Sequence, residues 1–460
     1  MSLQVVILAA GQGKRMRSAL PKVLHTLGGR PLLSHVIETA KKIPTLSEPP
    51  IVICGHHAEK VQDAFKQQPL EWVHQKEQLG TAHALMQALP YLKDENQVLV
   101  LSGDVPLISP KTLQKLVSST PKEAVGILTK TVPEPMGYGR IIRDDLGRIQ
   151  AIHEEKDLAE DEKQIHEINT GIYCFPVLHL RAWLPQIHNE NAQHELYLTD
   201  TIAIAAKCRV PVQSIKAAHI EEILGVNDLI QLAQLERYYQ KQQAIELMKQ
   251  GVKIMDPNRI DIRDTVVAST DVTLDINVIL EGHVELGSHC YVGPNAYLKN
   301  VVCKDHVNIQ ANCTIEDATI GSHCQIGPFA RIRPHSTLDT NVHIGNFVEI
   351  KNSLIGNASK VNHLSYIGDT EIGHAVNVGA GTITCNYDGA KKHKTRIHDN
   401  VHIGSGTELV APVEIGTNAT IGAGSIITKN VEPNKLTLTH VLNQRSIAWV
   451  RPTKDKAEEK

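Results

Sequence analysis

A glycine-rich loop near the N-terminus has the composition of a phosphate-binding segment. Residues 8–16 read LAAGQGKRM, and Pro21 and Lys22 follow. Small residues let a phosphate approach the backbone, amides at a helix start can donate to it, and Lys14, Arg15 and Lys22 add positive charge. The segment matches neither the Walker pattern nor the dinucleotide fingerprint. Because glycine-rich turns after strands are often purely structural, the loop alone leaves both interpretations open.

A second group of candidate residues lies in the C-terminal half. Arg333 and Lys351 each follow an isoleucine and are 18 residues apart, and His363 and Tyr366 come shortly afterwards. Two cations on one corner can hold a phosphate, although side by side they repel, and a nearby imidazole can act as a general base. The simpler interpretations are a solvated edge for the cations and an ordinary surface position for His363.

Asp104 is a third candidate. It follows an apolar run at residues 98–101, at the carboxyl end of a predicted strand, where α/β proteins form ligand sites. An isolated aspartate after a strand is usually a turn or cap residue, so its position alone does not establish a function.

The elements that must position these residues differ between the two halves. Up to residue 227, apolar runs at 5–10, 51–54 and 98–101 alternate with helix-forming sequence, which predicts an α/β domain with a parallel sheet. Asn227 and Asp228 then offer an N-cap, and residues 228–250 predict one linker helix. We therefore divide the chain into domains at 1–227, 228–250 and 251–460.

A six-residue period replaces this pattern in the third domain. Aliphatic residues recur from Ile320 through Ile326 and Ile332 onwards, and glycine commonly follows them. This period predicts a parallel β-helix with three repeats per coil and about ten coils between residues 252 and 437. The glycines and asparagines are expected at corners with positive φ. Exposed flat faces make a homotrimer an expected assembly.

Residues 384–396 interrupt the repeat. They contain the sequence NYDG followed by a basic run. An inserted loop here could reach a neighbouring subunit, whereas the alternative is a disordered bulge.

Composition excludes several functional classes. A net charge of −3 gives no broad basic field for nucleic acid. The eight cysteines form no C-x-x-C pair and indicate reduced thiols. Residues 5–10 are interpreted as a buried strand rather than a signal peptide, and nothing approaches the roughly 18 apolar residues of a membrane span. We expect a cytoplasmic protein without membrane insertion or a nucleic-acid partner.

The glycine-rich loop, taken together with Pro21 and Lys22, resembles the signature of sugar nucleotidyltransferases. The resemblance implies that Asp104 and Asn227 bind Mg²⁺ and that Lys22 contacts the triphosphate. The UTP and UDP-sugar contacts that it implies are Leu8, Ala9, Ala10, Gly11, Arg15, Lys22, Gln75, Gln78, Gly80, Thr81, Ser102, Gly139, Glu154, Asn169 and Asn227. Ser102 stands where uridylyltransferases of the family often have Tyr, and the sequence around Glu154 also departs from the usual pattern.

The residues of the β-helix resemble the acetyltransferase half of the family of bifunctional N-acetylglucosamine-1-phosphate uridylyltransferases and glucosamine-1-phosphate N-acetyltransferases. The resemblance implies that His363 is the catalytic base. It implies glucosamine-1-phosphate contacts at Arg333, Lys351, Tyr366, Asn377 and Lys392, and acetyl-CoA contacts at Ala380, Asn386, Tyr387, Ser405, Ala423 and His440. Family members commonly carry Arg where this chain has His440, so we expect weaker acetyl-CoA binding or compensation by a neighbouring lysine.

The resemblance extends from about residue 3 to residue 452. It implies a Rossmann-like nucleotidyltransferase domain, a linker helix and a left-handed parallel β-helix of hexapeptide repeats. It also implies a cytoplasmic homotrimer that acetylates glucosamine-1-phosphate with acetyl-CoA and then transfers UMP from UTP with Mg²⁺. The product, UDP-N-acetylglucosamine, would supply peptidoglycan and lipopolysaccharide precursors.

Two alternatives remain at this point. A single-activity sugar-1-phosphate nucleotidyltransferase with a structural β-helix would not need His363, Asn386, Tyr387 and Lys392. A non-catalytic trimeric scaffold would explain the repeats but not the cations at Arg333 and Lys351.

Overall fold

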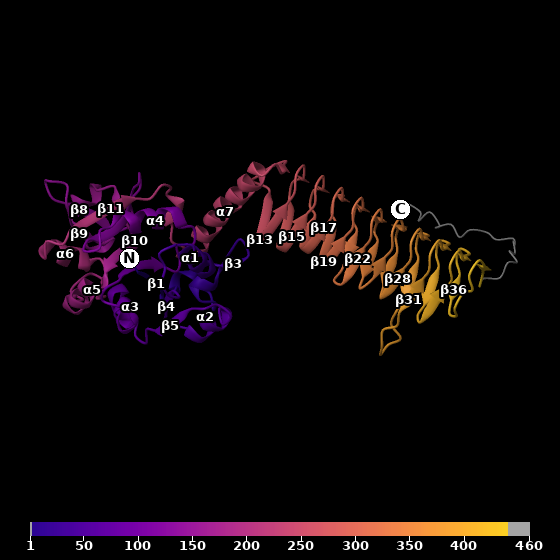
Figure 1. The fold of residues 1–460 in the computed structure, drawn as a ribbon, viewed down its shortest axis with the longest axis horizontal. Coiled ribbons are helices and arrows are strands. Elements are labelled where there is room, and N and C mark those ends of the chain that lie inside the picture. The colour runs from indigo at the N-terminus through magenta and orange to yellow at the C-terminus, as the bar shows by residue number, and fades with distance from the viewer. Residues whose placement is uncertain (1, 440–460) are drawn as a thin grey trace, which may run out of the picture. The chain divides into compact units, whose positions relative to one another are not determined.

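The computed structural model describes residues 2–439, which form two compact units (Figure 1). The first unit comprises Met1–Gln243 with Ile262–Asp264, and the second comprises Ala244–Asp261 with Thr265–Lys460. No helix in the described part of the chain has the length and apolar character needed to cross a bilayer.

A nine-stranded sheet forms the centre of the first unit. Its main order is β11-β7-β10-β6-β1-β4-β5, and the β8–β9 hairpin extends it beside β10. The strands are β1 (Leu3–Ala9), β4 (Ile51–Cys54), β5 (Glu71–His74), β6 (Gln97–Ser102), β7 (Val125–Thr131), β8 (Arg140–Arg143), β9 (Ile149–His153), β10 (Glu167–Pro176) and β11 (Val212–Lys216). β1 pairs in parallel with β4 and β6, as predicted, whereas β10 is antiparallel to both its neighbours.

Two hydrophobic cores cover the two faces of this sheet. Val5 and Ile7 of β1 enter one core with α1 and α4, and Val6 enters the other with α3, α5 and α6. Burial on both faces explains why β1 is a continuous apolar run rather than an alternating one. The helices of this unit are α1 (Leu32–Lys41), α2 (Ala58–Ala64), α3 (Thr81–Ala88), α4 (Pro110–Ser119), α5 (Val177–Trp183) and α6 (Asp200–Lys207).

Helix α7 (Leu229–Lys249) occupies the segment predicted as a linker helix. Asp228 caps it, because Asp228 Oδ1 accepts a hydrogen bond of 2.8 Å from the backbone N–H of Gln231. The side chain of Asn227 is therefore not needed for the cap.

The second unit is a parallel β-helix whose strands stack coil upon coil (Figure 1). One face is an eleven-stranded sheet: β12 (Lys253–Ile254), β14 (Thr273–Leu274), β16 (Tyr291–Val292), β18 (Asn308–Ile309), β20 (Gln325–Ile326), β23 (His343–Asn346), β26 (Lys360–His363), β29 (Asn377–Val378), β32 (His402–Ile403), β35 (Thr420–Ile421) and β37 (Leu436–Thr437). The register places Ile326 beside Ile344 and Ile344 beside Val361, so successive coils contain 18 and 17 residues. These aliphatic side chains are fully buried, as the six-residue period predicted.

The other two faces share one fifteen-stranded sheet. Its long strands β13 (Ile260–Ala268), β15 (Val278–Leu286), β17 (Tyr297–Cys303) and β19 (Thr314–Ile320) come first. Beyond β19 the sheet branches, because β21 pairs with the first part of β19 and β22 with its last part. One branch contains β21 (Arg331–Ile332), β24 (Glu349–Lys351), β27 (Tyr366–Gly368), β30 (Ile383–Cys385), β33 (Glu408–Val410) and β36 (Ile426–Ile427). The other contains β22 (Ser336–Leu338), β25 (Leu354–Ile355), β28 (Thr370–Ile372), β31 (Thr395–Ile397) and β34 (Val413–Ile415).

Asparagines such as Asn312 and Asn341 do have positive φ, as predicted, and so does Gly327, with φ of 99°. Most glycines that follow an aliphatic residue of the repeat, however, serve a different purpose from the one predicted. A Cβ at Gly321 would lie 2.6 Å from the carbonyl carbon of Asp339, and one at Gly345 would lie 1.9 Å from the carbonyl oxygen of Asn362. Glycine is therefore required because the next coil passes very close. The corners with positive φ come two residues later, at His323 and Phe347, with φ of 61° and 55°.

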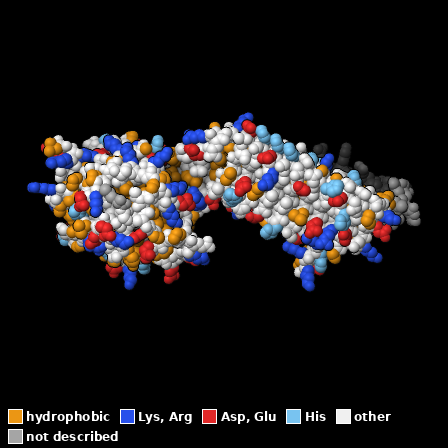
Figure 2. Space-filling model, in the orientation of Figure 1, with side chains coloured by type: hydrophobic (Ala, Val, Ile, Leu, Met, Phe, Trp, Pro, Cys, Tyr) orange, Lys and Arg blue, Asp and Glu red, His pale blue; other side chains and the backbone are white. Residues whose placement is uncertain are grey.

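Histidine is frequent at these corners. The rings of His289, His306 and His323 stack on consecutive coils with centroid separations of 4.8 and 4.7 Å. Figure 2 shows histidine side chains distributed along the surface of the second unit.

Candidate active sites

A cleft of about 680 Å³ opens in the first unit at the carboxyl ends of β1 and β6. Thirteen residues predicted to bind UTP or metal line it: Leu8, Ala9, Ala10, Gly11, Arg15, Lys22, Gln75, Gln78, Gly80, Thr81, Ser102, Asp104 and Asn227. The structure thus brings together five separate segments of the chain. The volume suits a nucleotide-sized ligand.

Lys22 lies between the two predicted metal ligands. Its Nζ forms an ion pair with Asp104 Oδ2 and donates a hydrogen bond of 3.4 Å to Asn227 Oδ1. Ser102 Oγ donates to the other Asp104 oxygen at 2.7 Å. The two oxygen donors already face a cation, and carboxylate and amide oxygens are of the type that Mg²⁺ prefers. Residues 2–439 contain no cluster of three or more His, Cys, Asp or Glu side chains suited to a metal.

Two glutamines shape the wall of the cleft. Gln75 is 2% exposed, and its Nε2 donates to the carbonyl of Gly80 at 3.3 Å and lies 3.0 Å from His83 Nδ1. Gln78 Nε2 in turn donates to the carbonyl of Gln75 at 3.0 Å. Gly80 has φ of 122°, and a Cβ there would lie 2.4 Å from the carbonyl oxygen of Leu196. The buried Gln75 therefore stabilises the loop at residues 75–80, and the side-chain amide of Gln78 is the one more accessible to a ligand.

The residues predicted to hold the sugar lie outside the lining of this cleft but form a cluster of their own. The backbone N–H of Asn169 donates to the carbonyl of Gly139 at 2.8 Å, and its side chain donates to the hydroxyl of Tyr173 at 2.8 Å. Thr199 Oγ1 donates to Glu154 Oε1 at 3.1 Å. Burial, followed by neighbouring carboxylates, raises the pKa of Glu154. Burial thus makes the charged form of this carboxyl group less favourable than it is in water.

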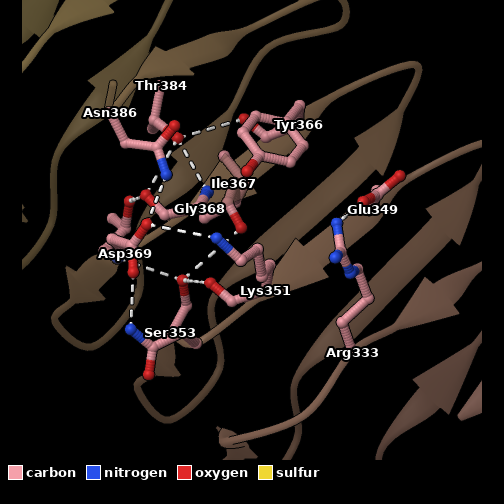
Figure 3. Close-up of polar contacts among 12 residues, drawn as sticks. Arg333, Glu349, Lys351, Ser353, Tyr366, Ile367, Gly368, Asp369, Thr384 and Asn386 are labelled. Atoms are coloured by element: carbon pink, nitrogen blue, oxygen red, sulfur yellow. Dashed lines mark hydrogen bonds and ion pairs between the residues drawn. The ribbon is translucent and has the colours of Figure 1, made fainter. Parts of the chain in front are cut away.

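The two cations of the β-helix have partners that the sequence interpretation did not include. Arg333 Nη1 lies 2.9 Å from Glu349 Oε1, and Lys351 Nζ lies 3.6 Å from Asp369 Oδ2 (Figure 3). The register does place Arg333 and Lys351 at the same corner of adjacent coils, as predicted. The expected repulsion between two unpaired cations was wrong, because each cation has a carboxylate partner from the next coil.

Asp369 is the centre of a polar network. It accepts a hydrogen bond of 2.5 Å from Asn352. It accepts another from the buried Asn386 (Figure 3). Burial opposes ionisation of Asp369, but these bonds and the charges of Lys351 and Lys392 outweigh it and lower its pKa. Contact with Lys351 lowers the pKa of Lys392. Two adjacent ammonium groups that share one carboxylate form a site suited to an additional anion.

The segment that interrupts the repeat is an ordered hairpin between β30 and β31, which projects from the coils (Figure 1). Tyr387 and Lys392 form an antiparallel bridge across it. Asp388 closes its tip by accepting from the backbone N–H groups of Ala390 and Lys391 at 2.8 and 2.6 Å. The hairpin brings Lys392 to Lys351 of the same chain and leaves Tyr387 61% exposed.

His363 belongs to a column of residues along one corner. Asn346 pairs with His363 in the register, and Asn346 Oδ1 lies 3.0 Å from His363 Nδ1. The same register places Ala380, Ser405 and Ala423 at the equivalent position of the next three coils. Backbone hydrogen bonds of 2.7 and 2.8 Å join these coils at the carbonyls of Ala380 and Ser405.

Asn377 and Tyr366 lie on strands that adjoin this column. Asn377 begins β29 and pairs with Lys360 of β26, and Tyr366 begins β27 just beyond the corner that follows His363. His440, the remaining predicted acetyl-CoA contact, lies outside the described residues.

Sequence reasoning missed several residues at both sites. Glu349, Asp369 and Asn346 lie 16 to 18 residues from the side chains that they contact, so the coil period could have identified them. Gln193 and Glu195, which line the first cleft, occur in an irregular loop without a recognisable motif.

Comparisons with known proteins match both units. The profile of the MobA-like NTP transferase domain matches residues 5–167, and that of the bacterial transferase hexapeptide (six repeats) matches residues 317–352 and 394–429. The bifunctional protein GlmU of Acinetobacter baumannii (strain AYE) is 52% identical over 99% of this chain and 99% of its own length. Proteins of the same name from Acinetobacter baylyi and Marinobacter nauticus are 51% and 47% identical, over 99% and 98% of this chain and 99% of their own lengths.

Proposed function

The chain belongs to the family of bifunctional GlmU proteins, and we propose that it makes UDP-N-acetylglucosamine in two steps at two separate sites. The β-helix transfers an acetyl group from acetyl-CoA to glucosamine-1-phosphate. The first unit then transfers UMP from UTP to the acetylated product and releases pyrophosphate. The observation that carries this proposal is full-length similarity to bifunctional relatives together with a distinct polar site in each unit.

In the uridylyl transfer, a phosphate oxygen of the sugar phosphate attacks the α-phosphorus of UTP, and pyrophosphate leaves. A phosphate oxygen is already nucleophilic, so this step needs no general base, and catalysis depends on positioning and charge neutralisation. Arg15 and Lys22 supply positive charge along the triphosphate. Asp104 and Asn227 would hold Mg²⁺, which supplies further charge neutralisation at the phosphates when bound. Lys22 then exchanges its contacts with these two residues for contacts with phosphate.

The sugar is held by Gly139, Glu154 and Asn169. Glu154, whose pKa is raised by burial, supplies a carboxyl group for a hydrogen bond with a sugar hydroxyl. Gln78 forms hydrogen bonds with the edge of the uracil ring, and its side chain is positioned by a hydrogen bond to the backbone carbonyl of the buried Gln75.

In the acetyl transfer, the amine nitrogen of glucosamine-1-phosphate attacks the carbonyl carbon of the thioester, the C–S bond breaks, and coenzyme A leaves as a thiolate that takes up a proton. His363 removes a proton from the amine as the new C–N bond forms. Arg333, Lys351 and Lys392 bind the phosphate of the sugar, with Tyr366 and Asn377 contributing polar contacts. Acetyl-CoA lies along the column of small residues Ala380, Ser405 and Ala423, with Tyr387 and the segment of Asn386 beside it.

The β-helix assembles as a homotrimer. Support comes from Phe329, Phe347 and Leu364, which lie at one corner of three successive coils and are 49%, 54% and 64% exposed. All three have positive φ, at 50° to 55°, which is costly for large side chains. A second copy packing on this ladder would offset that cost by burying it. Sedimentation velocity tests the assembly, and a Phe329→Ser, Phe347→Ser double variant is expected to shift it toward monomer.

The protein acts in the cytoplasm, in synthesis of cell-wall precursors. Its eight cysteines are free thiols, which suits a reducing compartment.

The decisive experiment supplies purified protein with glucosamine-1-phosphate, acetyl-CoA, UTP and Mg²⁺ and follows free thiol and pyrophosphate separately. We expect both products, with pyrophosphate release depending on acetyl-CoA. If pyrophosphate appears only with N-acetylglucosamine-1-phosphate and no thiol forms, the β-helix has a structural role and the single-activity alternative holds.

A further inference from the structure

A second hollow, of about 390 Å³, lies beside the uridylyl cleft at the carboxyl ends of β4 and β5. Residues 55–60 form one side, and His74, Lys76 and Gln78 form the other. The function proposed above uses only Gln78 from this lining. Its position matters because ligands of α/β sheets bind at the carboxyl edge of the strands.

Basic side chains dominate the hollow. His56, His57, Lys60, His74 and Lys76 line it, and Glu59 is the one acidic residue in its lining. None of these five basic side chains forms a hydrogen bond or ion pair within the part of the chain that the structure describes. This differs from the β-helix corner, where Arg333 and Lys351 each have a carboxylate partner.

Two of these basic side chains lie against each other. The rings of His56 and His57 are 3.9 Å apart, and His57 adopts a left-handed conformation with φ of 60°. Partial desolvation, and then the charges of His56 and Lys60, lower the pKa of His57. A bound anion would offset the repulsion among these groups.

The hollow is also in contact with the nucleotide loop. A Cβ at Gly55, in the lining, would lie 2.7 Å from the carbonyl oxygen of Ala10 and 2.9 Å from Gln78 Nε2. Gln78 lines both cavities. An occupant of the hollow that reaches Gln78 would therefore contact a residue of the uridylyl site.

We propose that this hollow binds the phosphate group of a small phosphorylated molecule other than the substrates, and that its occupancy changes the KM for UTP through Gln78. The site itself is independent of the function proposed above, whereas the effect on KM rests on that function. The volume accommodates a ligand of mononucleotide size but not a folded macromolecule.

Binding is tested by equilibrium dialysis of the full-length protein with radiolabelled inorganic phosphate and, separately, AMP. Saturating UTP and Mg²⁺ fill the neighbouring cleft, and ionic strength is held constant because exposed charges are screened by salt. The variant is His74→Leu with Lys76→Ala. The matched control is Lys66→Ala, which removes an exposed lysine outside the hollow.

We expect saturable binding to the wild type. The double variant should weaken it about tenfold, because two charge-assisted contacts are removed, and the control variant should leave it unchanged. Binding of AMP with higher affinity than phosphate would indicate a nucleotide as the natural source, and binding of phosphate alone would indicate the free anion. Equal binding by wild type and double variant, or no binding of either probe, would overturn the site.

The kinetic arm measures the KM for UTP with and without the bound probe. If the probe changes the KM for UTP of the wild type but not that of the double variant, the result supports coupling between the hollow and the uridylyl site. An unchanged KM overturns the coupling while the dialysis result still stands. Absence of any uridylyl transfer would instead contradict the proposed function and leave the binding result intact.

Discussion

Asn346 and His363 lie opposite each other on adjacent coils, with Asn346 Oδ1 3.0 Å from His363 Nδ1. The amide oxygen accepts a hydrogen bond from Nδ1–H, which selects the tautomer in which Nε2 carries no proton and is free to act as a base. The bond also orients the imidazole, whose side chain is otherwise exposed. The proposed base of the acetyl transfer is therefore held by a residue of the preceding coil.

Replacing Asn346 should change the acetyl transfer alone. Asn346→Leu is expected to lower its kcat about tenfold, because one orienting hydrogen bond is lost. Asn346→Asp keeps an acceptor but favours the charged imidazolium, so the acid limb of the pH–rate profile should move to higher pH. Steady-state thiol release between pH 5 and 9 measures both effects. If Asn346 had only a structural role, the variants would change the free energy of unfolding but not the pH–rate profile.

His363→Ala should separate the two activities. We expect acetyl transfer to fall by about 10²–10⁴, the usual contribution of a general base, while uridylyl transfer from N-acetylglucosamine-1-phosphate stays at the wild-type rate. Thiol and pyrophosphate assays on the same preparation give the comparison. An undiminished acetylation rate would rule out His363 as the base.

Two glycines of the uridylyl cleft should respond differently to alanine. Nothing lies within 4 Å of a Cβ at Gly11, so Gly11→Ala should change the free energy of unfolding by less than about 0.5 kcal/mol yet raise the KM for UTP. Gly80→Ala meets the backbone of Leu196 at positive φ and should lose at least about 1–3 kcal/mol. Denaturant unfolding and UTP kinetics distinguish them. Equal destabilisation by both variants would contradict the assignment of Gly11 to ligand contact.

Lys22 should compete with a divalent ion in the absence of nucleotide. Because its ammonium occupies Asp104 and Asn227, Lys22→Met is expected to increase affinity for Mn²⁺, used as a paramagnetic probe for Mg²⁺. The same variant should lower uridylyl kcat, since charge on the triphosphate is lost. Removing divalent ions with EDTA should abolish uridylyl transfer and spare acetyl transfer. Unchanged Mn²⁺ affinity in the variant would show that Lys22 and the ion do not share these ligands.

Asp369 should stabilise the β-helix in a pH-dependent way. Its pKa is lowered in the folded chain, so its contribution is present above the ordinary aspartate value near 3.9 and is lost as the pH falls through the lower folded value. Asp369→Asn should cost about 1–3 kcal/mol at pH 7, because Lys351 and Lys392 lose their shared carboxylate. Thermal unfolding across pH 3–7 should show this difference shrinking toward pH 3. A constant difference would indicate that the charge of Asp369 is not what stabilises the corner.

The sequence by itself was sufficient to predict both architectures, because each is encoded by a short-range period. Inward aliphatic residues such as Ile326 and Ile344 repeat every coil, and β1 is a continuous apolar run because both its faces are buried. The segments that line the first cleft were also identifiable, since the loop at residues 8–16 and the carboxyl end of β6 have local signatures.

The tertiary structure decided which side chains meet. Lys22 and Asp104 are 82 residues apart in the chain, and no local pattern indicates that they pair. Asp369 acquires its role only when coil stacking brings Lys351 and the hairpin residue Lys392 to one carboxylate. Gly321 and Gly345, assigned from sequence to positive-φ corners, are required instead because the adjacent coil leaves no room for a Cβ atom. Close approach between segments depends on the packed chain, so it could not be derived from the periodicity that predicts the fold.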